Sequence, residues 1–176
     1  MSTVSLGTKL VQAVQKEAAM QRPLPLQAIA EVAVPGASGR TLTAEVTLTD
    51  HDRFSHLIEA VTVSVTPPTT RHAPPLDTQE RAQRFAQRAT YLTEALQFVE
   101  KDAGGNATLR SSPSTMRGPR AEYFEAQVAE HAISLQRYQP HADKPGREPI
   151  PFCVTDEVLA RLADDATAAL VPPSKK

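Results

Sequence analysis

Residues 41–49 read TLTAEVTLT, so every second residue is apolar and the residues between them are four threonines and one glutamate. Successive side chains of an extended strand point to opposite faces, and this alternation therefore predicts a strand with one buried and one solvated face. Residues 57–66, LIEAVTVSVT, end in the same alternation, and residues 26–34, LQAIAEVAV, follow it with a weakly polar second face. Three such segments in succession predict an antiparallel meander with one face toward water.

Prolines bound the regular segments of the chain, which contains 15 of them. Proline lacks an N–H and is excluded from helix interiors and central strands, so its positions predict where regular structure stops. We therefore expect most of the fold within the proline-free windows, which are residues 1–22, 36–66, 76–112, 120–139 and 152–171.

Helix signals occur in three of these windows. Residues 5–20 carry apolar residues at helical spacing after a cap at Thr3 or Ser5. Thr155 is the predicted N-cap of a helix at the end of the chain. Residues 77–80, DTQE, have capping-box spacing and predict a helix between these two. Its predicted apolar stripe is Phe85, Ala89, Leu92 and Leu96.

Two hairpins are predicted in the second half of the chain. Residues 96–101 can either continue the preceding helix or form a strand. We favour the strand because residues 102–106, DAGGN, are rich in residues that tolerate positive φ, which makes residues 96–111 similar to a hairpin. Residues 123–128 and 133–138 predict the second hairpin.

The predicted element order is α-β-β-β-α-β-β-β-β-α. Grouped strands predict a single α+β domain over residues 1–176, with antiparallel sheet and helices packed on one face. Residues 5–65 and 77–138 each read as a helix followed by a meander, so a structural duplication with a linker at residues 67–75 is a further hypothesis. The element order is similar to that of type III secretion chaperones, small proteins that dimerise and bind extended secretion substrates. This similarity covers element order and no sequence motif.

Composition excludes several classes of protein. The chain carries 19 basic and 20 acidic residues with 40% hydrophobic residues, which excludes a disordered polyelectrolyte and a strongly basic nucleic-acid carrier. It has no apolar run long enough for a signal-peptide core or a membrane span. We therefore expect a cytoplasmic protein without nucleic-acid or membrane partners, and abundant arginine and alanine are compatible with a bacterial source.

A group of metal-capable side chains lies between the second and third predicted strands: Asp50, His51, Asp52 and His56. Imidazoles and carboxylates can hold a divalent cation. The pattern matches no established metal motif, and aspartates are common in turns for local hydrogen bonding. We predict a turn and no metal site, and keep His51, Asp52 and His56 as the alternative metal site.

Arginines supply the candidate anion-binding or partner-binding residues. One set lies in a stretch without acids and can hold a phosphate or carboxylate by forked hydrogen bonds: Arg110, Arg117 and Arg120. A second set, Arg84 and Arg88 together with Arg81, has helical spacing and predicts a solvated flank whose alkyl stems cover core edges. Its expected partner is the acidic patch of the last helix, Asp156, Glu157, Asp164 and Asp165. The alternative for the first set is a solvated hairpin connection.

Catalytic chemistry finds little support in the sequence. The single cysteine, Cys153, follows Ile150-Pro151-Phe152, and this apolar setting predicts a buried packing residue. No nucleophile elbow, His-Glu-x-x-His helix, dinucleotide fingerprint or P-loop occurs. We predict no catalytic residue and no cofactor.

These observations favour a non-catalytic cytoplasmic binding or adaptor protein that uses an antiparallel sheet face or edge to bind a protein or peptide partner. Sheet edges that are not covered also favour a homodimer. The alternative is a small-molecule-binding α+β domain or a metal-assisted hydrolase, with a pocket between the sheet and the C-terminal helix that uses His51 and His56.

Overall fold

The alternating segments form neighbouring antiparallel strands, as predicted. In the computed structural model, which describes residues 4–36, 39–68, 77–112 and 121–171, β1 (Leu26–Ala33) pairs with β2 (Thr41–His51). β2 pairs in turn with β3 (His56–Val65). Apolar residues of β2 such as Val46 are buried while the alternate Glu45 is exposed, which confirms one wet face.

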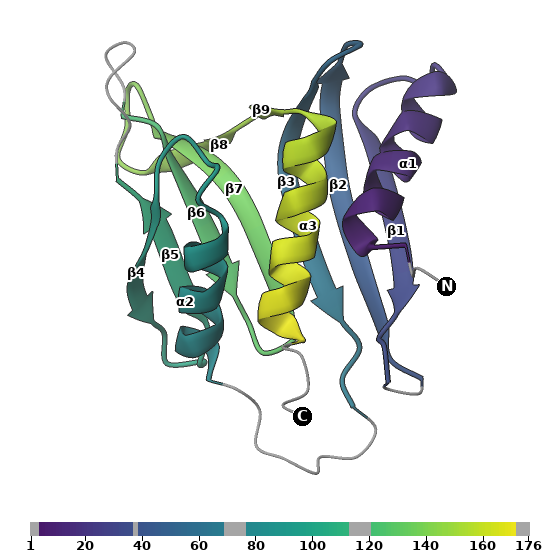
Figure 1. Ribbon diagram of the computed structural model, residues 1–176. Coiled ribbons are helices and arrows are strands. Elements are labelled where there is room, and N and C mark those ends of the chain that lie inside the picture. The colour runs from purple at the N-terminus through teal and green to yellow at the C-terminus, as the bar shows by residue number, and fades with distance from the viewer. Residues whose placement is uncertain (1–3, 37–38, 69–76, 113–120, 172–176) are drawn as a thin grey trace.

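A second meander completes the sheet. It consists of β4 (Leu96–Lys101), β5 (Ala107–Ser111), β6 (Tyr123–Val128) and β7 (Ala132–Pro140), so the strand predicted at residues 96–101 is confirmed. β3 and β7 pair antiparallel, giving the order β1-β2-β3-β7-β6-β5-β4 (Figure 1). The two halves of the chain thus share one sheet, and their duplication stays a hypothesis.

Two short strands were not predicted. β8 (Arg147–Ile150) pairs with β7, and β9 (Phe152–Val154) pairs with the start of β3. We expected most of the fold within the proline-free windows, and β8 lies outside them, whereas β9 begins the window 152–171, where the prediction was a helix. Proline is tolerated where a strand needs no N–H on one side, and Pro149 lies in β8, which pairs with a single strand.

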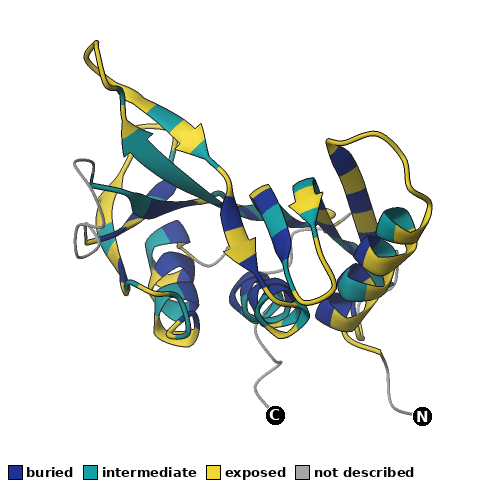
Figure 2. Cartoon of the chain, turned by 90° about the horizontal axis from the view of Figure 1, so that it is seen from above, coloured by how far each residue is buried: buried dark blue, intermediate teal, exposed yellow. Residues whose placement is uncertain are grey.

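All three helices pack on one face of the sheet, as predicted (Figure 2). α1 (Leu6–Ala19) covers β1 and β2, α2 (Thr78–Arg88) covers β4 to β6, and α3 (Asp156–Leu170) lies between them over β3 and β7. The core consists of the inward residues of the sheet and the facing residues of the helices. The antiparallel α+β class is therefore confirmed.

The N-caps of α1 and α3 agree with the sequence. Ser5 and Thr155 accept hydrogen bonds from the backbone N–H groups of Thr8 and Val158 at 3.1 and 3.2 Å. α2 is shorter than its predicted apolar stripe. Ala89 leaves the helical conformation with ψ of 49°, so Leu92 lies in the following turns and packs on the core from there.

Candidate binding surface on the open face of the sheet

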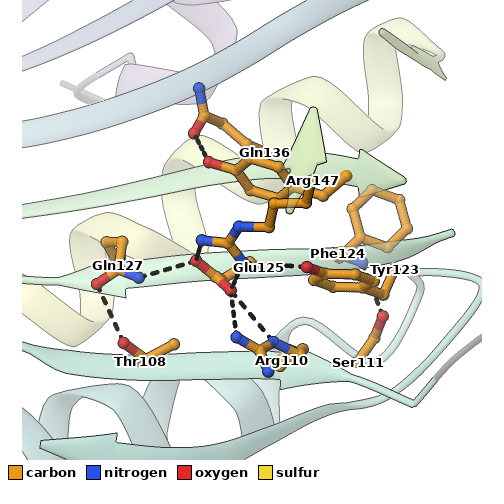
Figure 3. A network of polar contacts seen from close by, with 10 residues as sticks. Thr108, Arg110, Ser111, Tyr123, Phe124, Glu125, Gln127, Gln136 and Arg147 are labelled. Atoms are coloured by element: carbon orange, nitrogen blue, oxygen red, sulfur yellow. Dashed lines mark hydrogen bonds and ion pairs between the residues drawn. The ribbon is translucent and has the colours of Figure 1, made fainter. Parts of the chain in front are cut away.

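The sheet face opposite the helices carries a cluster of aromatic and charged side chains. Residues that alternate with the buried ones on β5, β6 and β7 point to this open face. Four such residues and one residue of β8 form what we call the open-face cluster: Arg110, Tyr123, Glu125, Tyr138 and Arg147. Figure 3 labels Arg110, Tyr123, Glu125 and Arg147.

Strand register brings the cluster together. Arg110 of β5 lies opposite Glu125 of β6, and Tyr123 of β6 lies opposite Tyr138 of β7. Directly opposed side chains in antiparallel strands are close enough to interact. β8 pairs with β7 and places Arg147 against both Tyr138 of β7 and Glu125 of β6.

Glu125 is the buried centre of the cluster, with 3% of its surface exposed. Its Oε2 accepts hydrogen bonds from Arg110 Nη2 at 2.9 Å and Nε at 3.2 Å. Arg147 Nη2 donates to Oε1 at 2.7 Å, Arg147 Nη1 donates to Oε2, and Gln127 Nε2 donates to Oε1 at 3.0 Å. Burial by itself raises the pKa of Glu125, but the hydrogen bonds from Arg147 and Arg110 outweigh it, and the pKa lies below its usual value.

The tyrosines hold the two guanidinium groups in place. The Tyr123 and Tyr138 rings stack with centroids 6.1 Å apart. Arg147 Cζ lies 4.1 Å from the Tyr138 centroid, and Arg110 Cζ lies 5.2 Å from the Tyr123 centroid. Hydrogen bonding to Glu125 raises the pKa of Arg147, so its charge is permanent. The cluster thus combines aromatic surface with two fixed positive charges and one buried negative charge.

The predicted arginine set is divided between two sides of the protein. Arg110 belongs to the open face, whereas Arg117 and Arg120 lie outside the described residues. Arg84 and Arg88 are on α2, in the helix layer. Arg84 pairs with Glu80 at 2.6 Å, and Arg88 pairs with Asp165 of α3 at 3.5 Å, which is one contact of the kind expected between α2 and the acidic patch.

Arg81 corrects the expectation that all three arginines of α2 form a solvated flank. Its residue is 6% exposed, and its guanidinium donates a hydrogen bond to the Glu130 carbonyl oxygen while Nε has no hydrogen-bond partner. Burial is the main cause that lowers the pKa of Arg81. The prediction of a solvated side chain was wrong for Arg81 because this residue lies on the buried side of α2, with Ala82 and Phe85.

The alternative metal site is arranged as a turn. Asp52 Oδ1 accepts hydrogen bonds from the backbone N–H groups of Phe54 and Ser55 at 2.7 and 2.8 Å. His51 lies opposite His56 across the β2–β3 hairpin. In the described part of the chain, no three histidine, cysteine, aspartate or glutamate side chains lie together as metal ligands.

His56 points toward the helix layer and is 6% exposed. Its Nε2 lies 2.7 Å from Oδ1 of Asp156 in the first turn of α3, and Gln15 of α1 donates to Oδ2 of the same carboxylate at 2.9 Å. The Nδ1 atom of His56 is buried without a hydrogen-bond partner. The pair therefore links β3, α3 and α1.

This arrangement predicts a structural role for His56. Asp156→Ala leaves a buried imidazole without its partner and is expected to lower the free energy of unfolding by about 1 to 3 kcal/mol. His56→Leu fills a similar volume and removes both nitrogens, so its cost should stay below about 1 kcal/mol. Urea unfolding measures both. Equal costs for the two variants would contradict this role.

Cys153 is exposed and not in the core, contrary to the sequence prediction. It is the middle residue of β9, and the buried residues of that strand are Phe152 and Val154. Strand alternation turns the cysteine outward, and the local apolar composition gave no sign of this because β9 itself was not predicted.

Four members of the open-face cluster were not among the predicted site residues: Tyr123, Glu125, Tyr138 and Arg147. Strand alternation in residues 123–128 could have placed Tyr123 and Glu125 on one face. No pattern could have placed Arg147 beside them, because it follows a proline-rich segment and reaches the cluster only through the pairing of β8 with β7.

Comparison of the chain with known protein families, with curated proteins and with solved structures finds no match. Among the described residues, no helix is both long and apolar enough to cross a membrane.

Proposed function

We propose that this protein is a non-catalytic cytoplasmic binding or adaptor protein that binds a protein or peptide partner on the open face of its sheet. The observation that carries the proposal is the open-face cluster, where two arginines stack on two tyrosines on a face that no described helix covers. Tyrosine and arginine are, with tryptophan, the residue types most enriched in the energetic centres of protein interfaces.

The state of the two guanidinium groups supports this proposal. The side chains of Arg110 and Arg147 are 42% and 37% exposed, so each presents part of its surface to a partner. Their stacking on tyrosines and their bonds to Glu125 restrict their motion, which reduces the entropy lost on binding. Within the described chain, Arg110 Nη1 and Arg147 Nε make no hydrogen bond and remain available as donors.

Charge favours a partner with an acidic side chain. Two arginines oppose one buried glutamate, which leaves a net positive charge on the cluster. A partner carboxylate can accept from the remaining guanidinium donors while its apolar neighbours lie on the tyrosine rings. We therefore propose an extended segment with acidic and aromatic or aliphatic residues as the partner.

The experiment is a selection of displayed random peptides on the immobilised protein, followed by affinity measurements on the enriched peptides. Tyr138→Ala removes the ring beneath Arg147 and is expected to weaken binding by roughly tenfold or more. Arg161→Ala is the matched control, because Arg161 stacks on Tyr91 at 4.2 Å on the helix side of the protein. The absence of enriched peptides, or equal loss of binding in both variants, would contradict the proposal.

A further inference from the structure

β1 is an edge strand of the sheet. Among the described strands it is the outermost on its side of the sheet, and its one partner there is β2 (Figure 1). Its pairing with β2 covers residues 26–33 without a register shift, and it contains no proline. The opposite edge differs, since β4 has a bulge between Phe98 and Glu100 and ends in two charged residues. Bulges and charges protect edges from pairing with other chains, whereas β1 has no bulge and carries one charged residue, Glu31.

The unpaired backbone groups of β1 can be assigned. Alternate residues of an antiparallel strand bond to the neighbouring strand. Just after β1, the Val34 N–H donates to the Arg40 carbonyl at 2.9 Å, so even-numbered residues face β2. Glu31, an odd-numbered residue, instead has its carbonyl oxygen 3.3 Å from Lys9 Nζ of α1. Gln27, Ile29 and Glu31 therefore direct their N–H and C=O groups away from the sheet.

Most of the large hydrophobic residues that are exposed lie in β1 or near it in the sequence. Six large hydrophobic residues are exposed in the described part of the protein. Four belong to β1 or to the segments that flank α1, and Ile29, at 52% exposure, is in β1 itself. The four are Val4, Met20, Leu24 and Ile29.

We propose that β1 pairs antiparallel with β1 of a second copy of this chain, in the register that places Ile29 opposite Ile29 of the partner subunit. The two outward-facing residues then form a hydrogen-bonded pair on the two-fold axis. The same register places Gln27 opposite the partner subunit's Glu31, so an uncharged amide meets each carboxylate. Centring on Glu31 would oppose two like charges, which is destabilising.

This pairing joins two sheets into one and extends the open face across the dimer. Lys9 is exposed, and its side chain can leave the Glu31 carbonyl when the N–H of the partner's Gln27 replaces it. The inference does not depend on the proposed peptide binding, since the open-face cluster lies on β5 to β8, across the sheet from β1. Either proposal can fail while the other stands.

Analytical ultracentrifugation of the full chain over a range of concentrations tests the dimer. The wild type is expected to reach twice the mass of one chain. Ile29→Lys places two lysines opposite each other and should raise the dissociation constant by about a hundredfold. Val99→Lys is the matched control on β4, where Val99 is 45% exposed, and should leave the dimer intact. A wild-type monomer, or a dimer that survives Ile29→Lys, would overturn the proposal.

Cysteine cross-linking tests the register in a Cys153→Ser background. Hydrogen-bonded opposed residues have Cα atoms about 5.5 Å apart, within the range that a disulfide spans. Ile29→Cys should therefore form a disulfide-linked dimer on oxidation. Gln27→Cys and Glu31→Cys should link to each other when mixed and not to themselves. Self-linking of either variant, with no link through Ile29→Cys, would overturn the register.

Discussion

Glu125→Ala is expected to destabilise the protein by about 2 to 4 kcal/mol. Glu125 is 3% exposed and accepts hydrogen bonds from both Arg110 and Arg147. Its removal leaves two guanidinium groups facing each other without the carboxylate between them. Because both side chains are more than one-third exposed, water compensates for part of the loss.

Guanidinium chloride unfolding of the wild type and of Glu125→Ala measures this cost. Glu80→Ala is the control, since Glu80 also pairs with an arginine, Arg84, but is 48% exposed. Exposed pairs contribute little, and this variant should lose about 1 kcal/mol or less. A loss for Glu125→Ala no larger than that of the control would show that the cluster does not stabilise the fold.

The same carboxylate predicts an acid-dependent loss of stability. The pKa of Glu125 is lowered in the folded protein, from an ordinary value of 4.5. A lowered pKa adds stability that is fully present above the unfolded-state value and is lost as the pH falls through the folded-state value. The difference in unfolding free energy between the wild type and Glu125→Gln should therefore be constant at neutral pH and shrink below 4.5. A difference that grew in acid would mean that the pKa is raised.

The alternating strands could be predicted from the sequence because their apolar residues all lie on one face. A shift of register by one residue would expose all of these side chains to water, so the pattern specifies both the strand and its buried face. β2 and β3 follow the predicted ranges for this reason. β8 and β9 could not be predicted in the same way, because each is too short to show an alternating pattern and β8 also contains Pro149. Each pairs with part of a longer strand. A strand can be predicted from its own sequence when its apolar residues alternate over enough positions to define a buried face.

The candidate site was largely beyond prediction because it is assembled across strands. Arg110 was singled out for its acid-free surroundings in the chain, yet its nearest partner is Glu125, 15 residues away in sequence. Asp77 shows the same limit on a smaller scale. Its position correctly predicted the start of α2, but its side chain makes no cap hydrogen bond and pairs with Lys101 of β4. Sequence spacing locates an element, and tertiary pairing decides what its side chains contact.

Gly7→Ala is expected to be the most disruptive small substitution in the helix layer. α1 and α3 approach each other closely at Gly7, where an added Cβ would lie 2.7 Å from the carbonyl carbon of Ala160 and 2.9 Å from its Cα, with the carbonyl oxygen closer still. These are backbone atoms of α3 and cannot rotate away. The Gly7 N–H also donates to Asp164 Oδ1 at 2.8 Å, and this bond would be lost if α1 moved.

Two effects oppose each other in this variant. Alanine favours a helix over glycine by about 1 kcal/mol, which would stabilise α1 if no contact were made. Overpacking costs about 1 to 3 kcal/mol and occasionally more, and a clash with rigid backbone atoms at these distances places Gly7→Ala at or above the upper end of that range. We therefore expect a net loss of at least about 2 kcal/mol in unfolding free energy and a lower melting temperature. Gly104→Ala is the matched control, because the nearest atoms to its added Cβ would be side-chain atoms, Asp102 Oδ1 at 3.2 Å and Asn106 Nδ2 at 3.6 Å, and it should change stability little. If Gly7→Ala stabilised the protein instead, the helix propensity would have prevailed, and α1 and α3 would have to lie farther apart than they do here.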